Sequence, residues 1–573
     1  MRKNEARLTL CTLSLLLSLV MLFTAACIQA PTARVTPAST TADFTFVFAG
    51  DTHSHMDPGD YILKLNGKDT LVEMGGLPRL ASAINDIRAK GDVILLHTGD
   101  VLFGTYYFIK YGITADADML NSMGFNAVTV GNHDFDKGPQ GLVELAAKSK
   151  VPFISANIDA SRLPDLAAAI KPYVVLTRNG QQIGIIGLTA TETPLLDPSG
   201  PDVKFTDPSA AARKAVDELT AQGVNKIVLL SHLGYERDMQ LVKSTSGIDL
   251  VIGGHSHTLL GPAELQNMGL PVAGGYPTIV KNSDGQDVPI VHAWEYSREI
   301  GVIKASFDQE GKLISYAGNP LIVIGDNMKQ ADAQGSYQAV AKDSAAYRDI
   351  STAFNSPSSL VRIYPEDSKI KQIRDTYYQP ISFLGDKIAT ADATLIDRDL
   401  APMLADALMW KAGKLGMAAQ FAFVPVSYLR DGRLIKGDFT GAPLYEFMPF
   451  ASPLVVCETT GDALQKLIGT LVNNPNPYTI VKSGTPYLAV SGLKFSVDSS
   501  RPRNITDMKI MVNGDYVPVK PEGTYSVVTT ARIAKGIFNV KQTADVTDSE
   551  VFIEYAKYLK NIGPVTEIRI VGW

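Results

Sequence analysis

Cysteine is scarce in this chain, with only Cys11, Cys27 and Cys457 among 573 residues. So few thiols exclude a disulfide framework of the kind that stabilises small secreted domains. Cys457 ends the apolar run Leu454–Cys457, a setting that favours a buried, inert thiol over a reactive one.

An excess of positive charge is also missing. The chain has 53 Lys and Arg against 59 Asp and Glu, a formal net charge of −6 and a pI near 5.8. Without a basic domain or a long basic run, a nucleic-acid-binding surface is not expected. The hydrophobic content of 45% is typical of a globular protein, and the length predicts at least two domains.

Long apolar runs are missing except near the amino terminus. Leu8–Phe23 follows the basic residues Arg2, Lys3 and Arg7, a pattern that predicts a secretory signal peptide over residues 1–27. We therefore expect an extracytoplasmic protein. Residues 28–42 are rich in Thr, Ala, Ser and Pro and are expected to form a flexible tether.

The end of this signal resembles a bacterial lipobox. In Thr24-Ala25-Ala26-Cys27 only Thr24 departs from the pattern, which usually has Leu there. The resemblance implies that Cys27 is lipidated and anchors the chain at a membrane, on the cell surface or in the periplasm. A simple cleaved signal and an uncleaved anchor are the alternatives.

Short polar blocks follow β-prone apolar runs through the first half of the chain. The blocks are Asp51-Thr52-His53, Gly99-Asp100, Gly131–Asp136, Ser231-His232 and Gly253–His257. They contain five of the eight histidines. Buried parallel strands in open α/β sheets place their sites at the carboxyl ends of the strands, so we expect these blocks to meet.

The side chains in these blocks are suited to divalent cations. Imidazole, carboxylate and amide groups together favour metals such as Zn, Mn, Fe, Co or Ni. A carboxylate can bridge two cations, and Asp100 is the candidate for that role. The candidate ligands are Asp51, His53, Asp100, Asn132, His232, His255 and His257. A metal-dependent hydrolase is the function that this set favours.

Alternating strand and helix patterns predict an α/β domain over residues 43–325. A polar, Ala- and Ser-rich connector is expected over 326–359, with a helix at Gln338–Ile350. Residues 360–573 are expected to form a mixed α+β domain. Its expected helices are Leu400–Leu415, Asp462–Val472 and Ser549–Asn561, with strands near residues 421–425, 454–458, 488–490, 509–512 and 525–529.

The polar blocks resemble the calcineurin-type metallophosphoesterase pattern of bacterial 5′-nucleotidases and 2′,3′-cyclic-nucleotide phosphodiesterases. The resemblance implies a four-layer α/β/β/α sandwich followed by a 5′-nucleotidase C-terminal domain. It also implies two cations that share Asp100. One would be held by Asp51, His53, Asp100 and His257, and the other by Asp100, Asn132, His232 and His255. Zn, Mn, Co, Mg and Ca are not distinguished by these ligands.

The same resemblance assigns His133 and Asp136 as the catalytic pair. Asp136 would fix the tautomer of His133, which would stabilise the transition-state oxyanion and protonate the leaving group. Two such cations, expected to lie about 3.5–4 Å apart, would polarise the phosphoryl oxygens and lower the pKa of a bound water to about 7, which would favour attack of hydroxide on phosphorus. The expected substrate is a small-molecule phosphate ester, with nucleoside 5′-monophosphates and 2′,3′-cyclic nucleotides as the candidates. The oligomeric state is not predicted.

The second domain matches the family less closely. Arg430 lies close to the expected phosphate-binding arginine, and Phe450 matches the first of two rings that clamp the base, as a guanidinium and an aromatic face would suit. A surface arginine and a core phenylalanine are the alternative interpretation. Pro425-Val426-Ser427 replaces the expected Asn-Gly-Gly, and Arg532-Ile533-Ala534-Lys535-Gly536 replaces the second clamp.

Because of these departures, two other functions are kept open. The same dimetal hydrolase could act on a sugar phosphate, a pyrophosphate or a sulfur ester. Alternatively, the chain could be a lipoprotein that binds a ligand without turning it over. Such a binding protein would be expected to have lost part of the ligand set, whereas all seven candidate ligands and His133 are present.

Overall fold

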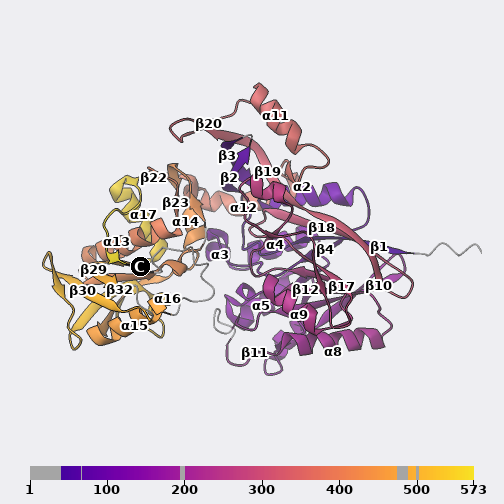
Figure 1. Ribbon diagram of the computed structural model, residues 1–573, viewed down its shortest axis with the longest axis horizontal. Coiled ribbons are helices and arrows are strands. Elements are labelled where there is room, and N and C mark those ends of the chain that lie inside the picture. The colour runs from indigo at the N-terminus through magenta and orange to yellow at the C-terminus, as the bar shows by residue number, and fades with distance from the viewer. Residues whose placement is uncertain are drawn as a thin grey trace, which may run out of the picture.

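The computed structural model describes residues 41–65, 67–193, 200–430, 432–473, 488–498 and 502–572. The expected signal peptide, its lipobox-like end and nearly all of the tether lie outside these residues. Within them, no helix is both long enough and apolar enough to cross a membrane. Figure 1 shows the two lobes that the described residues form, with the second lobe in orange to yellow.

A large mixed sheet forms one half of the first lobe. In spatial order its main path is β2 (Gly59–Leu65), β3 (Lys68–Met74), β19 (Leu313–Ala331), β18 (Glu299–Phe307), β1 (Ala42–Ala49), β4 (Ile94–His97), β5 (Ala127–Thr129), β6 (Phe153–Ile154) and β8 (Ile170–Lys171). β1, β4 and β5 are parallel neighbours. The residues of β4 and β5 are mostly apolar and fully buried, as expected of interior parallel strands.

A second sheet lies against the first. Its order is β16 (Thr278–Lys281), β17 (Asp287–His292), β13 (Leu250–Gly253), β12 (Ile227–His232), β10 (Gln181–Thr189) and β9 (Tyr173–Arg178). β10, β12, β13 and β17 run parallel. Phe46 and Phe48 from the first sheet and Ile252 from the second share one buried core between the sheets.

Helices cover the outer faces of both sheets. On the first sheet these are α2 (Leu77–Arg88), α4 (Thr114–Met123) and α5 (Gly138–Lys148), and on the second α8 (Pro208–Ala221) and α9 (Tyr235–Ser244). Leu80 and Leu142 pack with Leu95 on one side, and Leu219 packs with Leu229 on the other. The predicted α/β/β/α sandwich is confirmed.

The connector differs from its expected form. Where a helix was expected at Gln338–Ile350, the chain first forms β20 (Tyr337–Ala339), which pairs with β19, and α11 (Ala345–Phe354) begins later. The Ser344 side chain accepts the Tyr347 N–H and thereby caps α11 at this later position. Strand pairing therefore outweighs helical spacing over the first residues.

The residues after the connector stay with the first lobe. β21 (Val361–Ile363) pairs with β19, and α12 (Ser368–Tyr378) packs beside α2 and α4. The chain passes to the second lobe through η2 (Gln379–Gly385). By packing, the second lobe thus begins later than residue 360, where the sequence places the domain boundary.

The second lobe is a mixed α+β domain. One sheet has the order β28 (Leu488–Ser491), β24 (Phe421–Pro425), β32 (Thr524–Thr530), β27 (Pro453–Thr460) and β33 (Asn539–Thr547). Another has the order β31 (Asp515–Pro518), β30 (Ile505–Val512), β29 (Leu493–Val497) and β35 (Ile570–Val571). The three expected helices are present as α13 (Asp397–Lys414), α15 (Gly461–Asn473) and α17 (Asp548–Leu559).

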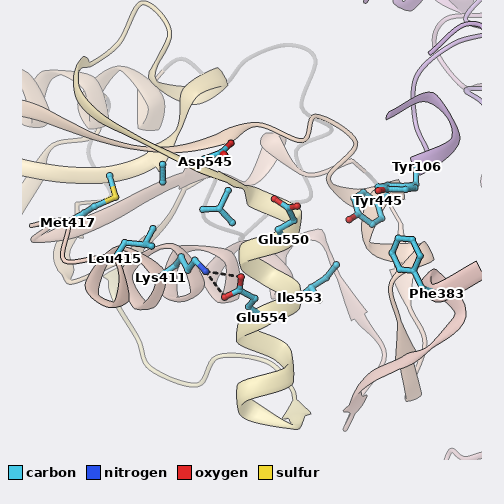
Figure 2. A pocket seen from close by; sticks show the side chains of 12 residues that line it. Tyr106, Phe383, Lys411, Leu415, Met417, Tyr445, Asp545, Glu550, Ile553 and Glu554 are labelled. Atoms are coloured by element: carbon cyan, nitrogen blue, oxygen red, sulfur yellow. Dashed lines mark hydrogen bonds and ion pairs between the residues drawn. The ribbon is translucent and has the colours of Figure 1, made fainter. Parts of the chain in front are cut away.

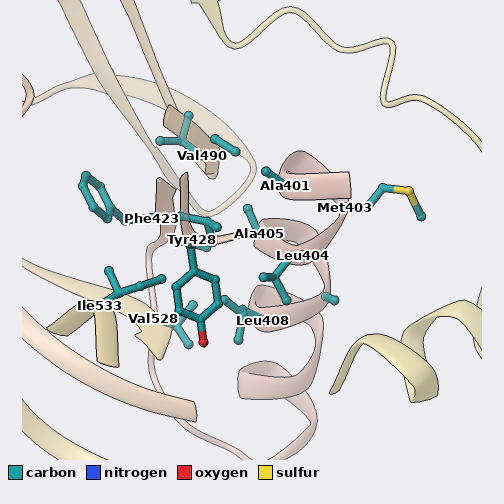
Figure 3. Packing of buried hydrophobic residues seen from close by; sticks show 14 of the residues in the cluster. Ala401, Met403, Leu404, Ala405, Leu408, Phe423, Tyr428, Val490, Val528 and Ile533 are labelled. Carbon is teal, nitrogen blue, oxygen red and sulfur yellow. The ribbon is translucent and has the colours of Figure 1, made fainter. Parts of the chain in front are cut away.

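Helix α13 supplies the centre of this domain's core. Leu404 and Leu408 of α13 belong to one buried cluster with Phe423 of β24 and Val528 of β32, part of which Figure 3 shows. A cavity of about 750 Å³ lies where the two lobes meet, and its lining includes Tyr106 from the first lobe and Tyr445 and Lys411 from the second (Figure 2). None of the candidate metal ligands lines it.

Glu299 is an unusual residue in the sandwich. Its side chain lies on the same face of β18 as that of Ile303, which packs in the core between the two sheets. Only 1% of Glu299 is exposed. Neither carboxyl oxygen has a hydrogen-bond partner among the described residues, and burial raises its pKa well above 4.5. The folded protein therefore holds Glu299 in its neutral form.

This burial predicts a pH-dependent stability. The unfolded chain loses the Glu299 proton near pH 4.5 while the folded chain keeps it, so Glu299 lowers stability increasingly as the pH rises above that value. We expect Glu299→Gln to melt at a higher temperature than the unchanged protein by a margin that grows as the pH rises from 5 to 8. Glu310→Gln, at an exposed position, is the control. A difference that stays constant with pH would contradict the argument.

Candidate metal centre

The polar blocks meet at one edge of the sandwich because the parallel strands before them end there. Asp51 and His53 follow β1, Asp100 follows β4, and Asn132 follows β5. From the second sheet, His232 ends β12, and the block 253–257 begins at the last residue of β13. The carboxyl ends of the two sheets therefore face each other across the site.

The backbone at this edge is strained. Five candidate ligands have φ between 46° and 76°, in the left-handed region: Asp51, His53, Asp100, His255 and His257. Non-glycine residues rarely adopt this conformation, and where they do the strain commonly marks a functional site. The chain segments also approach closely, since a Cβ on Gly254 would lie 2.7 Å from Asp51 Oδ2.

The candidate ligands form two groups. In one, Asp51, His53 and His257 each offer a ligand atom within 4.8 Å of the others, and in the other Asp100, His232 and His255 do so. Asp100 Oδ2 lies 3.5 Å from His53 Nε2 and 3.2 Å from His232 Nε2, and so stands between the groups. This is the position that a bridging carboxylate needs.

Hydrogen bonds on the far side of each ring fix which nitrogen faces the site. His53 Nδ1 donates to the carbonyl of Phe103 at 2.8 Å, and His232 Nδ1 donates to that of Thr98 at 2.6 Å. In the neutral form of both rings, Nε2 then carries the lone pair. A hydrogen-bonded outer nitrogen of this kind is the usual arrangement for histidines that bind metals.

The ring nitrogens that face the site are placed to bind a cation rather than to hydrogen-bond to one another. His53 Nε2 and His257 Nε2 are 3.1 Å apart, although the outer nitrogen of each ring is bonded to an acceptor. Two lone pairs at this distance repel unless a proton or a cation lies between them, and Zn–N distances of about 2.0–2.1 Å bring two such ligands this close. The donor set therefore fits a pair of divalent cations.

Asn132 completes the second group. Its Oδ1 lies 3.2 Å from His232 Nε2 and 2.8 Å from His255 Nδ1. Burial lowers the pKa of His232, but Asp100 outweighs burial and raises the pKa to about 10. Because a metal ligand must be neutral imidazole, metal binding at this group would release a proton.

The predicted catalytic pair lies beside the two groups. His133 Nδ1 donates to Asp136 Oδ2 at 2.8 Å, and the ring stacks on Phe103 with centroids 4.8 Å apart. The His133 backbone N–H donates to Asp100 Oδ1 at 2.8 Å, which fixes its place next to the ligands.

Both residues predicted for substrate binding reach this place from the second lobe. Arg430 Nη2 donates to His133 Nε2 at 3.0 Å, and its guanidinium lies 4.8 Å from the Phe103 ring centroid. The Phe450 ring lies 5.3 Å from Phe103. The structure thus brings all eleven candidate residues into one region, while their roles as ligands and catalytic groups stay predictions.

Two carboxylates in the site were not predicted. Glu192 Oε1 accepts from His255 Nε2 at 3.3 Å, and Glu295 Oε2 accepts from His257 Nδ1 at 2.6 Å. Glu192 follows β10 and Glu295 follows β17, so the rule that found the other blocks also applies to them. The signal for them in the sequence is weak, because each is a single acid that lies three residues after the end of its strand, as Asp100 does.

Both carboxylates are ionised. Burial raises the pKa of Glu192, but the hydrogen bond from His255 and further contacts outweigh it and lower the pKa to about 2. Burial likewise opposes ionisation of Glu295, and the hydrogen bond from His257 outweighs it, so that its pKa is lowered. Glu295 also accepts from Arg298 at 2.6 Å.

Comparison with known proteins agrees with this geometry. Residues 44–259 match the family described as calcineurin-like phosphoesterase, and residues 383–545 match the 5′-nucleotidase C-terminal domain. The crystal structure of a 5′-nucleotidase precursor from Thermus thermophilus is 32% identical with a TM-score of 0.76, covering 93% of this chain and 99% of that one.

Two relatives match over nearly their whole length. A probable 5′-nucleotidase of Treponema pallidum is 28% identical over 92% of this chain and 94% of its own. An NAD 5′-nucleotidase of Haemophilus influenzae is 27% identical over 90% of each chain. With the two matched domains in the same order and a metal-binding geometry at the strand ends, the chain belongs to the 5′-nucleotidase family of calcineurin-like phosphoesterases and is a metal-dependent phosphoester hydrolase.

Proposed function

We propose that this chain hydrolyses nucleotides outside the cytoplasm, with nucleoside 5′-monophosphates or 2′,3′-cyclic nucleotides as substrates. The observation that carries the proposal is the contact between Arg430 and His133, which brings a guanidinium of the second lobe, a group suited to phosphate, to the edge of the candidate metal centre. The names of the relatives, 5′-nucleotidase and NAD 5′-nucleotidase, support the nucleotide as substrate.

The chain's own residues position the ester. Arg430 presents a planar fork of N–H donors that suits two phosphoryl oxygens. Phe103 holds this fork and the His133 ring on its surface, so both groups face the same point. When bound, two divalent cations would polarise the phosphoryl oxygens and supply an activated water, held by the seven candidate ligands.

His133 is suited to move a proton at Nε2. Asp136 accepts the Nδ1 proton, so a second proton on Nε2 creates an imidazolium that the Asp136 carboxylate stabilises. From Nε2 this proton can be donated to the leaving oxygen or to a charged phosphoryl oxygen. The ring's stacking on Phe103 and the His133 N–H bond to Asp100 keep Nε2 directed into the site.

A pyrophosphate is the second candidate substrate, favoured by the relative named NAD 5′-nucleotidase. Metal analysis of the purified protein, combined with chromatography of the products from AMP, cyclic AMP isomers, UDP-glucose and p-nitrophenyl phosphate, tests both candidates. AMP and p-nitrophenyl phosphate would release phosphate, whereas hydrolysis of a cyclic nucleotide or of UDP-glucose would give monophosphate esters. We expect chelation to abolish hydrolysis and divalent metal to restore it. If no nucleotide is hydrolysed in a metal-dependent way, the proposal is wrong.

We further propose that the chain is exported and anchored through a lipid on Cys27, on the basis of the amino-terminal sequence pattern. Cys27→Ala should move the protein from the membrane fraction of cells to the soluble extracytoplasmic fraction. Fractionation and labelling with a radioactive fatty acid measure this. A variant that stays at the membrane without label would favour an uncleaved anchor instead.

The role of His133 predicts a separation between metal binding and turnover. His133→Ala removes the proton donor but none of the candidate ligands, so metal content should stay at the level of the unchanged protein. Turnover should fall by about 10²- to 10⁴-fold, the usual contribution of a general acid. Metal analysis and steady-state kinetics on the same sample measure both. A parallel loss of metal and activity would assign His133 to metal binding instead.

The carboxylate behind His257 predicts a change in metal affinity. Glu295→Gln keeps the size of the side chain but removes the charge that raises the basicity of His257, so metal affinity should fall by about 10- to 100-fold. Activity measured against metal concentration gives the shift. Glu264→Gln, at an exposed position on α10 (Ala263–Asn267), is the control. Equal metal dependence in both variants would contradict the role of Glu295.

A further inference from the structure

Three of the eight histidines belong neither to the candidate ligands nor to the predicted catalytic pair: His55, His97 and His292. None of them is more than 5% exposed. His97 is the last residue of β4 and His292 is the last residue of β17, so one lies at the edge of each sheet. Burying an imidazole costs free energy unless its nitrogens find partners, a cost that an apolar residue avoids. The partners of these two rings therefore indicate why histidine stands there.

His97 connects two of the polar blocks. Its Nδ1 accepts the Gly99 N–H at 3.2 Å, and its Nε2 donates to the Thr52 hydroxyl at 3.1 Å. Gly99 directly precedes Asp100, and Thr52 stands between the two candidate ligands that follow β1. Burial lowers the pKa of His97 to about 3, so the ring is neutral and Nδ1 stays an acceptor. The ring thus joins the two loops that carry three of the candidate ligands.

These loops need such support because their backbone is strained. Asp51 and His53 have φ values of 46° and 48°, a conformation that persists only where the surroundings impose it. Backbone bonds of 3.1 Å and 3.0 Å hold the N–H groups of both residues on the neighbouring loop. The bond from His97 holds Thr52 between them. An apolar side chain at position 97 could fill the space but could not make this contact.

His292 has the corresponding place in the second sheet. Its Nε2 donates to Asp238 Oδ2 at 3.0 Å, and Asp238 Oδ1 accepts from the Ser231 hydroxyl at 2.5 Å. Ser231 directly precedes the candidate ligand His232. A Cβ on Gly253, where the last polar block begins, would lie 2.2 Å from His292 Nε2 and 2.3 Å from Asp238 Oδ2. The pair therefore supports both strand ends that bring histidines to the site from this sheet.

We infer that His97 and His292 are positioning residues of the metal centre, one for each sheet, and that they raise its affinity for metal without binding a cation. Neither belongs to a group of side chains that could hold a cation among the described residues. Each acts through the residues beside the ligands, His97 through Thr52 and Gly99, and His292 through Asp238. The inference deepens the proposed function and rests on the metal centre which that function requires.

Calorimetric titration of the metal-free protein with Co²⁺ tests this inference. His97→Leu removes both hydrogen bonds, and His292→Leu removes the bond to Asp238. Each should weaken Co²⁺ binding by about tenfold or more, the effect of losing a partner behind metal ligands. His97→Gln and His292→Gln keep an N–H donor on the side chain. Each Gln variant should therefore lose less affinity than the Leu variant at the same position.

A matched control separates affinity from stability. Leu219→Ala removes a fully buried side chain from the core on the outer face of the second sheet, away from the candidate ligands. The cavity should lower the melting temperature of the metal-free protein. Because the strand ends keep their contacts, the affinity of this variant for Co²⁺ should equal that of the unchanged protein.

The remaining outcomes would overturn the inference. Unchanged Co²⁺ affinity in either Leu variant would show that the ring does not position ligands. Equal losses in the Gln and Leu variants would assign the effect to the shape of the side chain, and an equal loss in Leu219→Ala would assign it to stability. In these cases Co²⁺-dependent hydrolysis by the unchanged protein would still support the proposed function. If the unchanged protein binds no Co²⁺, the metal centre, the proposed function and this inference are all wrong.

Discussion

The buried carboxylate of Asp100 is the interaction on which the arrangement of the site depends. It lies between His53 of the first sheet and His232 of the second, and all three side chains are almost completely buried. A carboxylate in such surroundings is stable only with charged or hydrogen-bonding partners. The nearby histidines outweigh the effect of burial and lower the pKa of Asp100 well below its usual value. The edges of the two sheets therefore cannot separate or slide without leaving a buried charge unpaired.

Much of this arrangement could be predicted because it depends on local sequence. Apolar runs such as Ile227–Leu230 identify interior strands, and a polar block at the end of such a run must lie at the sheet edge. The four supporting contacts behind the histidines are different. Two are made by backbone carbonyls, those of Phe103 and Thr98, which leave no trace in the amino-acid sequence. The other two come from Glu192 and Glu295, single acids after strand ends whose place behind particular histidines depends on which strands are neighbours in the second sheet.

In the connector, by contrast, the local sequence predicts the wrong element. Gln338–Ile350 has helical spacing, yet Gln338 pairs with Gln330 on β19 and the helix starts only at Ala345. Helix propensity contributes less than about 1 kcal/mol per residue, so pairing with a long strand already fixed in the sheet can outweigh it. β19 spans Leu313–Ala331, and its length is itself a property of the assembled sheet that local patterns do not predict.

The contact between Arg430 and His133 relates the position of the second lobe to the protonation of the histidine proposed to be catalytic. Arg430 can donate to Nε2 only while that nitrogen carries a lone pair, whereas donation of a proton to a leaving group requires Nε2 to be protonated. The two states exclude each other. A phosphoryl oxygen placed between the two groups resolves the conflict, because it accepts from both the guanidinium and the imidazolium. In the proposed function, substrate binding would therefore replace a contact within the protein by two charge-assisted bonds to the ester, and His133 would be protonated where the ester can receive the proton.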